Sequence, residues 1–396
     1  MKYIVLIIDG ASGWPLKEHG GKTSLELART PHLDALAAEG ELGLAATVPE
    51  GMEASSACAC MSLLGYDPQV YYGGRAGIEA RSMGIPVGDD EAVFRANLVA
   101  VKDGRMWSYS SGHISTGEAA ELIGALNKEL GSDAVRFYPG ISYRHLLKLK
   151  DHLETLEAVC MPPHDIPDEP IVGYLPQGRG SAFLRELMAA SEAVLKEHSV
   201  NMARRARGAI PATMLWLFWG SGLIPDMPAF KDVYGERVAL TSGVDLLRGL
   251  GGMMGMHILN ITGVSDGADN DYSAQVEGAL RALDDHDLVV IHVEAPDEAA
   301  HSGSVTDKVA AIERVDSDMV ARLCAYAGDK LRLLIMPDHP TPVETRRHIG
   351  ESVPFLLWGP GLAANGAAAF SEAEAGKTGL FLEKGYNIMG RLLGAD

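Results

Sequence analysis

Short apolar runs of strand length recur along the chain, and turn-forming residues bound each of them. The runs that predict strands cover residues 3–8, 214–219, 238–241, 257–261, 288–293, 331–336 and 353–358. Between them, apolar residues spaced three and four apart predict helices at residues 31–39, 244–250, 272–284, 306–327 and 387–393. Strands that are apolar on both faces and alternate with helices are typical of a parallel sheet covered on both sides. The pattern therefore predicts a doubly wound, mostly parallel α/β fold.

The segment at residues 92–177 interrupts this rhythm. A stretch rich in proline and acidic residues lies near its end, at residues 161–170. The segment also contains short predicted strands and one predicted helix, at residues 95–101, 135–138, 143–148 and 116–130. These features predict a smaller α/β domain inserted into a discontinuous core, which consists of residues 1–91 and 178–396.

Composition narrows the classes of partner. The chain has 396 residues, 47% of them hydrophobic, and a formal net charge of −19, which repels nucleic acid and anionic lipid. The sequence contains no apolar stretch of the roughly 20 residues that cross a bilayer, and the short apolar run after Met1 lacks the features of a signal peptide. We therefore expect a cytoplasmic protein that binds neither nucleic acid nor membranes. An anionic substrate would need a local cluster of cations.

Carboxylates and imidazoles follow three of the predicted strands. The residues in question are Asp9, Asp297, His301, Asp338, His339 and His348. Because the carboxyl ends of parallel strands meet at one edge of a sheet, these side chains can converge. Together they supply enough ligands for two divalent ions, with Zn or Mn favoured and Mg, Co or Fe compatible. Taken singly, each of these residues could serve another role instead of binding a metal, either forming a turn or making hydrogen bonds at the surface or in the core.

A nucleophile is the remaining requirement. Ser55 and Ser56 lie in a loop of small residues that precedes a helix-like run at residues 61–64. A serine at a helix N-terminus is often only a cap, but a helix dipole and a metal ion can lower the pKa of its hydroxyl and make it a nucleophile. Cys58 and Cys60 suggest a thiol mechanism or a metal site as an alternative, although small buried cysteines are commoner. The sequence contains no C-x-x-C pair and no disulfide framework.

The order of these residues, together with several longer strings, resembles the alkaline phosphatase superfamily. The strings are RTPHLDALAAEGELGL, SLLGYDPQVYYGGRAGIEA, AVFRANLV, GHIST, HVEAPDEAAH, PDHPTP and HIGESVPF. They are similar to cofactor-independent phosphoglycerate mutases of the archaeal type and follow the family order along nearly the whole chain. The resemblance implies an alkaline-phosphatase-like fold whose inserted domain closes over the substrate.

The resemblance also implies roles for individual residues. Ser56 would accept the phosphoryl group. One metal ion would be held by Asp9, Ser56, Asp338 and His339, and the other by Asp297, His301 and His348. Arg75 and Lys308 match basic positions near the phosphate. Three matched positions in the inserted domain would hold the carboxylate end of the substrate and move protons: Arg144, His164 and Asp165.

The implied reaction interconverts 2-phosphoglycerate and 3-phosphoglycerate through a phosphoserine. It would use two divalent metal ions (Mn, Zn, Mg or Co) and no 2,3-bisphosphoglycerate. The expected partner is a small phosphorylated acid, and assembly into a homo-oligomer stays open.

The chain departs from the family pattern beside the nucleophile. The family loop Gly-Ser-Asp-x-Ala reads SSACA at residues 55–59, so Ala57 replaces an aspartate, and the family string GRG reads GRA at residues 74–76. The strings FYPGISYRHLL and EAPDEA resemble a bacterial subgroup proposed to act as homoserine kinase. Three alternatives therefore stay open: phosphoryl transfer to homoserine, action on a related phosphorylated or phosphonate acid, and a catalytically silent binding protein on the same fold.

Overall fold

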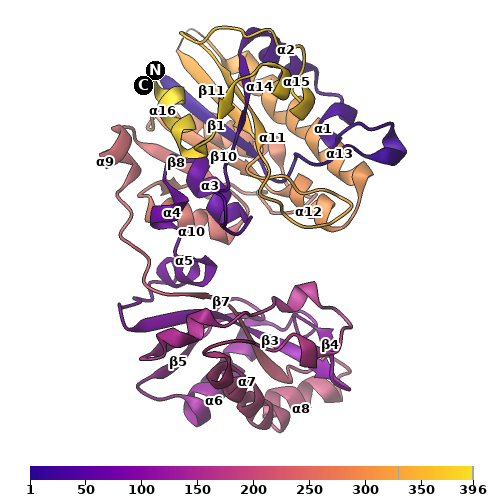
Figure 1. Ribbon diagram of the computed structural model, residues 1–396, viewed down its shortest axis with the longest axis vertical. Coiled ribbons are helices and arrows are strands. Elements are labelled where there is room, and N and C mark those ends of the chain that lie inside the picture. Colours follow the sequence, from indigo (N-terminus) through magenta and orange to yellow (C-terminus); the bar gives the residue numbers. More distant parts are fainter. Residues whose placement is uncertain (329, 395–396) are drawn as a thin grey trace. The chain divides into compact units, whose positions relative to one another are not determined.

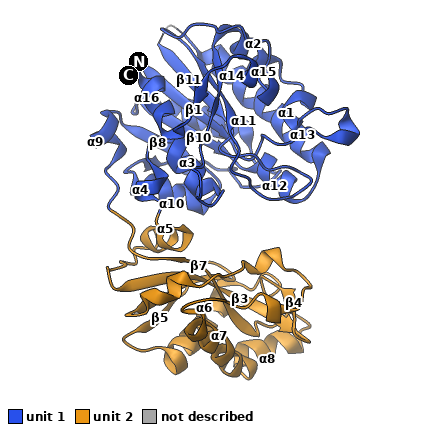
Figure 2. Cartoon of the chain, viewed as in Figure 1, with its two compact units in different colours: residues 1–72, 226–396 blue, residues 73–225 orange. Residues whose placement is uncertain are grey.

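The computed structural model describes residues 1–328 and 330–394 and divides the chain into two compact units. Unit 1 comprises residues 1–72 and 226–396, and unit 2 comprises residues 73–225 (Figure 2). Unit 2 is thus wider on both sides than the insertion predicted at residues 92–177. The physical reason is that α5 (Arg75–Ser82) packs on the sheet of unit 2, and that β7 (Met214–Ser221) pairs along β3 (Glu91–Lys102) of that sheet.

Unit 1 is built on a sheet with the strand order β13-β2-β12-β11-β1-β10-β8-β9 (Figure 1). The central strand β1 (Lys2–Ile8) runs parallel to β10 (Leu288–Val293) and β11 (Leu331–Met336), and these strands are almost entirely buried. The parallel order continues through β8 (Val238–Thr241) and β9 (His257–Ile258).

On the far side of β11, two strands run antiparallel to their neighbours. These are β12 (Val353–Trp358), which pairs with β11, and β2 (Glu41–Ala45), which pairs with β12. The edge strand β13 (Phe381–Leu382) is parallel to β2. The mostly parallel sheet explains why the sequence shows continuous apolar runs rather than strict alternation.

Helices cover both faces of this sheet. One face packs alternate residues of β1 against four helices: α2 (Pro31–Glu39), α11 (Tyr272–Ala282), α13 (Val305–Arg314) and α14 (Ala321–Tyr326). The other face carries α3 (Ser56–Leu63), α10 (Asp245–Met253) and α16 (Ile388–Leu393) (Figure 1). The remaining helices of unit 1 are short: α1 (Ser24–Leu27), α4 (Pro68–Tyr71), α9 (Phe230–Tyr234), α12 (Ala295–His301), α15 (Glu372–Lys377), η1 (Lys17–His19) and η6 (Gly385–Asn387).

The helix predicted at residues 306–327 is continuous but has a π-helical middle, η5 (Val315–Val320), between α13 and α14. This turn presents the buried Asp316 to the start of α2, where its carboxylate accepts hydrogen bonds from His32 N and Leu33 N at 3.3 and 2.7 Å. The N-cap residue of α2, Thr30, makes no side-chain capping bond. Asp316 therefore supplies from another helix the acceptor that a local cap usually provides.

Unit 2 contains an antiparallel sheet in the order β4-β3-β6-β5. A fifth strand, β7, also pairs antiparallel with β3, along the edge opposite to β6. Its further strands are β4 (Arg105–Ser108), β5 (Val135–Tyr138) and β6 (Arg144–Lys150). One face packs against helices through Phe94, Ala96 and Leu98. The helices and turns are α6 (Thr116–Leu130), α7 (Ser181–Lys196), α8 (Ser199–Ala206), η2 (Leu153–Glu157), η3 (Pro163–Asp165) and η4 (Ile171–Gly173).

The strand expected in the core at residues 214–219 therefore belongs to unit 2. The predicted α/β class, with a mostly parallel main sheet, is confirmed. None of the described helices is both long enough and apolar enough to cross a membrane.

Candidate active site

The carboxyl ends of β1, β10 and β11 gather the acidic and imidazole side chains of unit 1. Asp9 directly follows β1, and its neighbour Ile8 pairs with Val293 at the end of β10. Asp297 lies in α12, which begins just after β10, and Asp338 follows β11. Because these three strands are parallel neighbours, residues far apart in sequence meet at one edge of the sheet.

Asp297, His301 and His348 form one group of candidate metal ligands, called here the Asp297 cluster. Asp297 Oδ2 lies 3.0 Å from His301 Nε2 and 3.3 Å from His348 Nε2, and the two ring nitrogens lie 2.9 Å apart. Burial lowers the pKa of His301, but the hydrogen bond to Asp297 and its charge outweigh burial and raise that pKa to about 9. In the metal-free protein this cluster therefore holds a proton at neutral pH.

Asp9, Asp338 and His339 form a second group, called here the Asp338 cluster. His339 Nε2 lies 3.5 Å from Asp9 Oδ1 and 3.3 Å from Asp338 Oδ2, and all three side chains are fully buried. Burial, together with the charges of Asp338 and Asp297, raises the pKa of Asp9 well above its usual value. Burial also lowers the pKa of His339 to about 4, so its imidazole is neutral at pH 7.

Backbone groups fix the orientation of Asp338. Its Oδ1 accepts hydrogen bonds from Gly10 N at 3.2 Å and from His339 N at 2.8 Å, which leaves Oδ2 facing His339 Nε2. Gly10 has φ of 59°, and a Cβ atom there would lie 2.2 Å from Asp297 Oδ1. Glycine is therefore required where the chain turns out of β1 between the two clusters.

Ser56 is the first residue of α3, and its Oγ lies 3.1 Å from His339 Nε2. The preceding Ser55 is the N-cap, and its Oγ accepts a hydrogen bond from Cys58 N at 3.4 Å. The two adjacent serines thus divide two roles, since one caps the helix and the other presents its hydroxyl to the Asp338 cluster. The N-terminal end of a helix also favours a negatively charged group at this position.

The donor sets of the two clusters fit divalent cations. Bonds of about 2.0–2.2 Å with tetrahedral angles place ligand atoms about 3.3–3.6 Å apart, and the donor separations within the clusters lie close to this range, from 2.9 to 3.5 Å. The buried Asp9 Oδ1 has no hydrogen-bond partner in the described part of the chain. Buried polar atoms are almost always satisfied, and a cation would satisfy this one.

Lys308 lies beside the Asp297 cluster but is held by backbone groups. Its buried Nζ donates to Ser12 O at 2.9 Å and to Thr341 O at 2.8 Å. Thr341 Oγ1 in turn donates to Asp297 Oδ1 at 2.5 Å. Burial lowers the pKa of Lys308 to about 8, against the opposing charge of Asp297. Lys308 therefore ties together the loops that follow β1 and β11.

The cysteines that follow Ser56 in α3 do not form a thiol site. Cys58 and Cys60 are fully buried, and burial raises the pKa of Cys58 to about 12 and that of Cys60 well above its usual value. The thiol of Cys60 donates to Asp338 Oδ2 at 3.7 Å. Ala57 is also fully buried, so the position that carries an aspartate in the family pattern is here part of the packing of α3.

Unit 2 brings together three guanidinium side chains, called here the arginine cluster: Arg75 at the start of α5, Arg95 in β3 and Arg144 in β6. Arg75 Nε donates to Glu79 Oε1 at 3.3 Å, and the buried Arg95 also pairs with Glu79. Burial lowers the pKa of Arg95 to about 10 against the attraction of Glu79, and the charges of Arg75 and Arg144 lower it further. Arg75 and Arg95 thus share one carboxylate, and Arg144 adds a third positive charge nearby. Arg95 Nε has no partner among the described residues. An anionic ligand would offset this excess of positive charge.

His164 lies among aromatic rings beside this cluster. Its ring centroid is 5.5 Å from that of Trp219 and 6.2 Å from that of Phe218, and the Arg75 guanidinium lies 4.3 Å from the Trp219 centroid. Asp165 Oδ1 is 3.8 Å from His164 Nε2. Arg75, Arg144 and His164, which the sequence singled out at distant positions, are thus brought together within unit 2.

Sequence reasoning missed four polar residues of these sites. His292, near the end of β10, places its Nε2 2.8 Å from Asp9 Oδ2 and 3.6 Å from Oε2 of Glu294, which directly follows that strand. Both residues lie within one of the quoted strings. Their position directly at the end of a buried strand was the available signal. Arg95 and Thr341 gave no local signal, because a charged residue inside a strand and a threonine in a loop are both common.

Comparison with known proteins places this geometry in a family. A sequence profile described as 2,3-bisphosphoglycerate-independent phosphoglycerate mutase matches residues 37–201. Proteins of that name from Methanothrix thermoacetophila and Methanosarcina barkeri are each 44% identical to the chain. The alignment covers 99% of the chain and 99% of the Methanothrix protein, and 100% of the chain and 100% of the Methanosarcina protein. Among solved structures, the PH0037 protein of Pyrococcus horikoshii matches 100% of this chain and 98% of its own, with a TM-score of 0.80 and 26% identity. The chain therefore belongs to the family of 2,3-bisphosphoglycerate-independent phosphoglycerate mutases.

Proposed function

We propose that this protein interconverts 2-phosphoglycerate and 3-phosphoglycerate, with Ser56 as the residue that accepts and returns the phosphoryl group. The observation that carries this proposal is the position of the Ser56 hydroxyl, 3.1 Å from His339 Nε2 and at the first residue of α3. A phosphate ester formed there would lie at a helix N-terminus, where free N–H groups and the helix dipole favour negative charge.

Two divalent metal ions complete the proposed centre. Asp9, Ser56, Asp338 and His339 would hold one, and the Asp297 cluster (Asp297, His301 and His348) would hold the other. When bound, such ions would supply positive charge that lowers the pKa of a serine hydroxyl and stabilises a transferring phosphoryl group. Mixed imidazole and carboxylate ligands suit Mn or Zn, and Co or Mg remain compatible. No 2,3-bisphosphoglycerate is needed, because the phosphoryl group passes through the protein.

The chain's own residues have further tasks in the proposal. His339 is neutral at pH 7 because burial lowers its pKa to about 4, so its Nε2 is available to face a cation or a hydroxyl. Lys308 contributes buried positive charge near Asp297 and fixes the loops on either side of it. Arg75 offsets charge on the phosphoryl oxygens.

The arginine cluster of unit 2 would recognise the acid end of the substrate. Arg95 Nε lacks an acceptor, and Arg144 adds a second guanidinium to the same region. Arginine binds carboxylate and phosphate oxygens through parallel N–H donors, which fixes orientation as well as charge. His164, whose ring lies beside Trp219 as the Arg75 guanidinium does, would move protons to and from the glycerate hydroxyl groups together with Asp165.

The test is turnover of 3-phosphoglycerate, coupled to enolase, by protein loaded with Mn and without added 2,3-bisphosphoglycerate. Ser56→Ala should lower turnover by on the order of a thousandfold or more, because the covalent route is lost. The matched control is Ser55→Ala, which removes the N-cap of α3 at a cost of about 1 kcal/mol but keeps the nucleophile. Mass spectrometry of the rapidly quenched wild type should find the phosphoryl group on Ser56.

Wild-type turnover in Ser56→Ala, or a requirement for 2,3-bisphosphoglycerate, would contradict the proposal. Phosphoryl transfer to homoserine is the competing reaction, and it would appear as ATP consumption dependent on homoserine with no mutase activity. The comparisons give no support to that reaction, since every relative reported above is named as a mutase or is known only by its structure. A catalytically silent protein would neither turn over 3-phosphoglycerate nor become phosphorylated.

A further inference from the structure

Two histidines meet at the edge of the unit 1 sheet that lies opposite to the ligand clusters described above. His257 is the first residue of β9, and His286 lies in the turn between α11 and β10. Both are at the amino ends of parallel strands, whereas Asp9 and Asp338 follow carboxyl ends. The six residues of β10 separate the two edges by about 20 Å. The two histidines, called here the histidine pair, are therefore distinct from the proposed active centre.

The ring nitrogens of this pair face each other. His257 Nδ1 lies 3.1 Å from His286 Nε2, and the ring centroids are 5.0 Å apart with the planes inclined by 31°. Two nitrogens bound to one cation, with bonds of about 2.0–2.1 Å, stand about 2.9 Å apart at a right angle and about 3.3–3.4 Å apart at the tetrahedral angle. The observed separation lies between these values. One cation can thus bind both nitrogens with little movement of either ring.

A backbone hydrogen bond determines the tautomer of His286. Its Nδ1 lies 2.9 Å from Ala282 O at the end of α11, and this nitrogen must carry the hydrogen because a carbonyl oxygen only accepts. In the neutral ring the lone pair therefore stays on Nε2, the nitrogen that faces His257. A backbone carbonyl bound to the second ring nitrogen is a usual support of a histidine ligand. His286 is thus already in the form that binds a cation.

The other ring of the pair can change its tautomer. In the metal-free protein, His257 Nδ1 donates the one hydrogen that lies between the two facing nitrogens. A cation in this place requires that hydrogen to move to Nε2 of His257, which gives the second tautomer of the neutral ring. Two neutral histidines therefore bind a cation without losing a proton from the protein.

The turn that carries His286 is held from two sides. His286 N donates to Ala282 O at 3.0 Å, and Lys2 Nζ donates to His286 O at 2.7 Å. These bonds join the turn to α11 and to the start of β1. The ring of His286 is therefore placed by backbone that is itself fixed.

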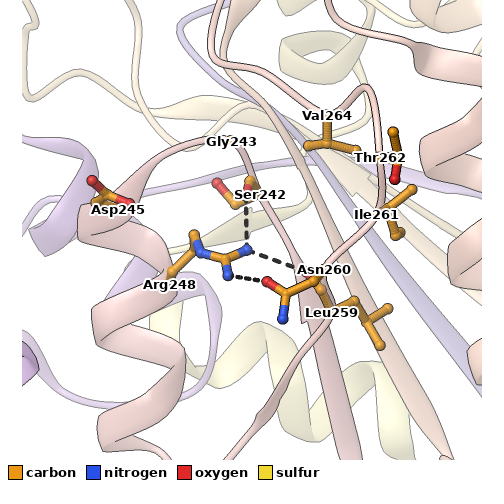
Figure 3. A pocket seen from close by; sticks show the side chains of 9 residues that line it. All are labelled: Ser242, Gly243, Asp245, Arg248, Leu259, Asn260, Ile261, Thr262 and Val264. Carbon is orange, nitrogen blue, oxygen red and sulfur yellow. Dashed lines mark hydrogen bonds between the residues drawn. The ribbon is translucent and has the colours of Figure 1, made fainter.

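A cavity of about 350 Å³ beside the carboxyl end of β9 shows how that strand is held (Figure 3). Arg248, which lies on α10, donates to Leu259 O at 3.2 Å and to Asn260 Oδ1 at 2.6 Å. Leu259 N in turn donates to Leu240 O of β8 at 2.8 Å. The segment that begins at His257 is therefore anchored to α10 and β8, although β9 is an edge strand. Ligands on such fixed elements keep their separation.

The charges around the pair do not oppose a cation. Two positive side chains near the turn, Lys2 and Arg237, both pair with Asp287, at 3.7 and 3.0 Å. Asp284 and Asp285, which directly precede the histidine of the turn, are exposed. These three acids outweigh the two positive side chains, so the local potential favours a bound cation.

We propose that His257 and His286 together bind one divalent cation of the Ni, Cu and Zn group, with water in its remaining positions. Imidazole nitrogens suit these ions, whereas Mg and Ca prefer oxygen. Such an ion would join the edge strand β9 to the turn before β10 and stabilise this edge of the sheet. The inference goes beyond the proposed function and does not depend on it, because neither histidine belongs to the two ligand clusters.

Zinc binding tests the inference. Chelator-treated protein is dialysed against rising free zinc concentrations up to saturation, and the zinc bound per chain is measured by elemental analysis. We expect His257→Gln and His286→Gln each to bind one ion fewer than the wild type. The double variant should also bind only one ion fewer, because the two histidines share the ion. The matched control is His19→Gln, at an exposed histidine of η1, which should bind as many ions as the wild type.

A zinc count that either single variant leaves unchanged, or a double variant that lacks two ions, would overturn the shared site. Loss of an ion from the control as well would show nonspecific binding and would also overturn it. Should one single variant fail to fold, the other decides the question, since the site needs both nitrogens. All three single variants should keep Ser56-dependent turnover with Mn, so rejection of this site would leave the proposed function standing.

Discussion

Replacing Glu372 should test how strongly its hydrogen bonds to the loop after Asp9 stabilise unit 1. Its Oε1 accepts hydrogen bonds from Ser12 Oγ at 2.8 Å and Gly13 N at 3.1 Å, and its Oε2 accepts one from Thr23 Oγ1 at 2.7 Å. Burial raises the pKa of Glu372, although these donors oppose the shift. The carboxylate thus joins α15 to the loop at residues 10–13, which also supplies the carbonyl that Lys308 binds.

The magnitude follows from these three bonds. A hydrogen bond to a charged acceptor contributes about 1.5–3 kcal/mol, and a donor left without a partner costs about 1–3 kcal/mol unless water replaces the acceptor. Because water can reach part of the vacated space, we expect Glu372→Ala to lower the free energy of unfolding of unit 1 by about 3–5 kcal/mol. Glu372→Gln keeps the size of the side chain and one good acceptor, so its cost should be about 1–2 kcal/mol.

The measurement is urea and thermal unfolding of chelator-treated protein, followed by circular dichroism and tryptophan emission. A loss of this size lowers the melting temperature by about 2–4 °C for each kcal/mol in a domain of 150–250 residues. Glu374→Gln on the same helix is the control, since its carboxylate accepts only at the surface, from Lys377 Nζ and Ala368 N. That change should stay within about 0.5 kcal/mol. A loss in Glu372→Ala no larger than in the control would refute the role assigned to these three bonds.

Three further predictions concern a helix cap, a proton and a guanidinium. Asp316→Ala should lower the free energy of unfolding by about 2–4 kcal/mol in urea titrations, because the N-terminus of α2 loses its acceptor. Asp318→Ala, at a partly exposed side chain of the same helical turn, should change it by less than about 0.5 kcal/mol, and equal losses would contradict the assigned role. His301 is protonated below its pKa of about 9, so a cation must displace that proton in order to bind. Metal affinity, measured by chelator competition, should therefore rise about tenfold per pH unit from pH 7 to 9. An affinity that does not change with pH would count against His301 as a ligand. Arg95→Lys should raise KM for 3-phosphoglycerate about tenfold, with a smaller change in kcat, because lysine cannot offer two parallel N–H donors. The control is Arg105→Lys, at an exposed side chain, which should change neither constant. An unaltered KM in Arg95→Lys would show that Arg95 does not bind the substrate.

Several features of the fold were predictable because they depend on local pattern. Continuous apolar runs identified the buried parallel strands of unit 1, and the positions of acids and histidines directly after those runs identified residues of both ligand clusters. The reason is geometric, since parallel strands end at one edge and the residue after each strand faces that edge. Membership of the mutase family, which the sequence strings suggested, is confirmed by full-length similarity to relatives.

The limits of the inserted unit could not be predicted in this way. The run at residues 214–219 is as apolar as the strands of unit 1, yet β7 pairs antiparallel with β3 of unit 2. An apolar run indicates that a strand is buried, but it does not indicate to which sheet the strand belongs. The division between the two units therefore depends on long-range pairing that no local pattern encodes.

The sequence by itself determined the type of fold, the family and the candidate ligands. These follow from apolar runs, their periodicity and the order of motifs, which are all local features of the sequence. The family resemblance singled out Ser56, but only the tertiary structure shows that Ser55 Oγ caps α3 while Ser56 Oγ faces His339. It also decided that Lys308 is bound by two backbone carbonyls and that Arg95 lacks an acceptor. These outcomes depend on distances between side chains of different elements, which the fold alone sets.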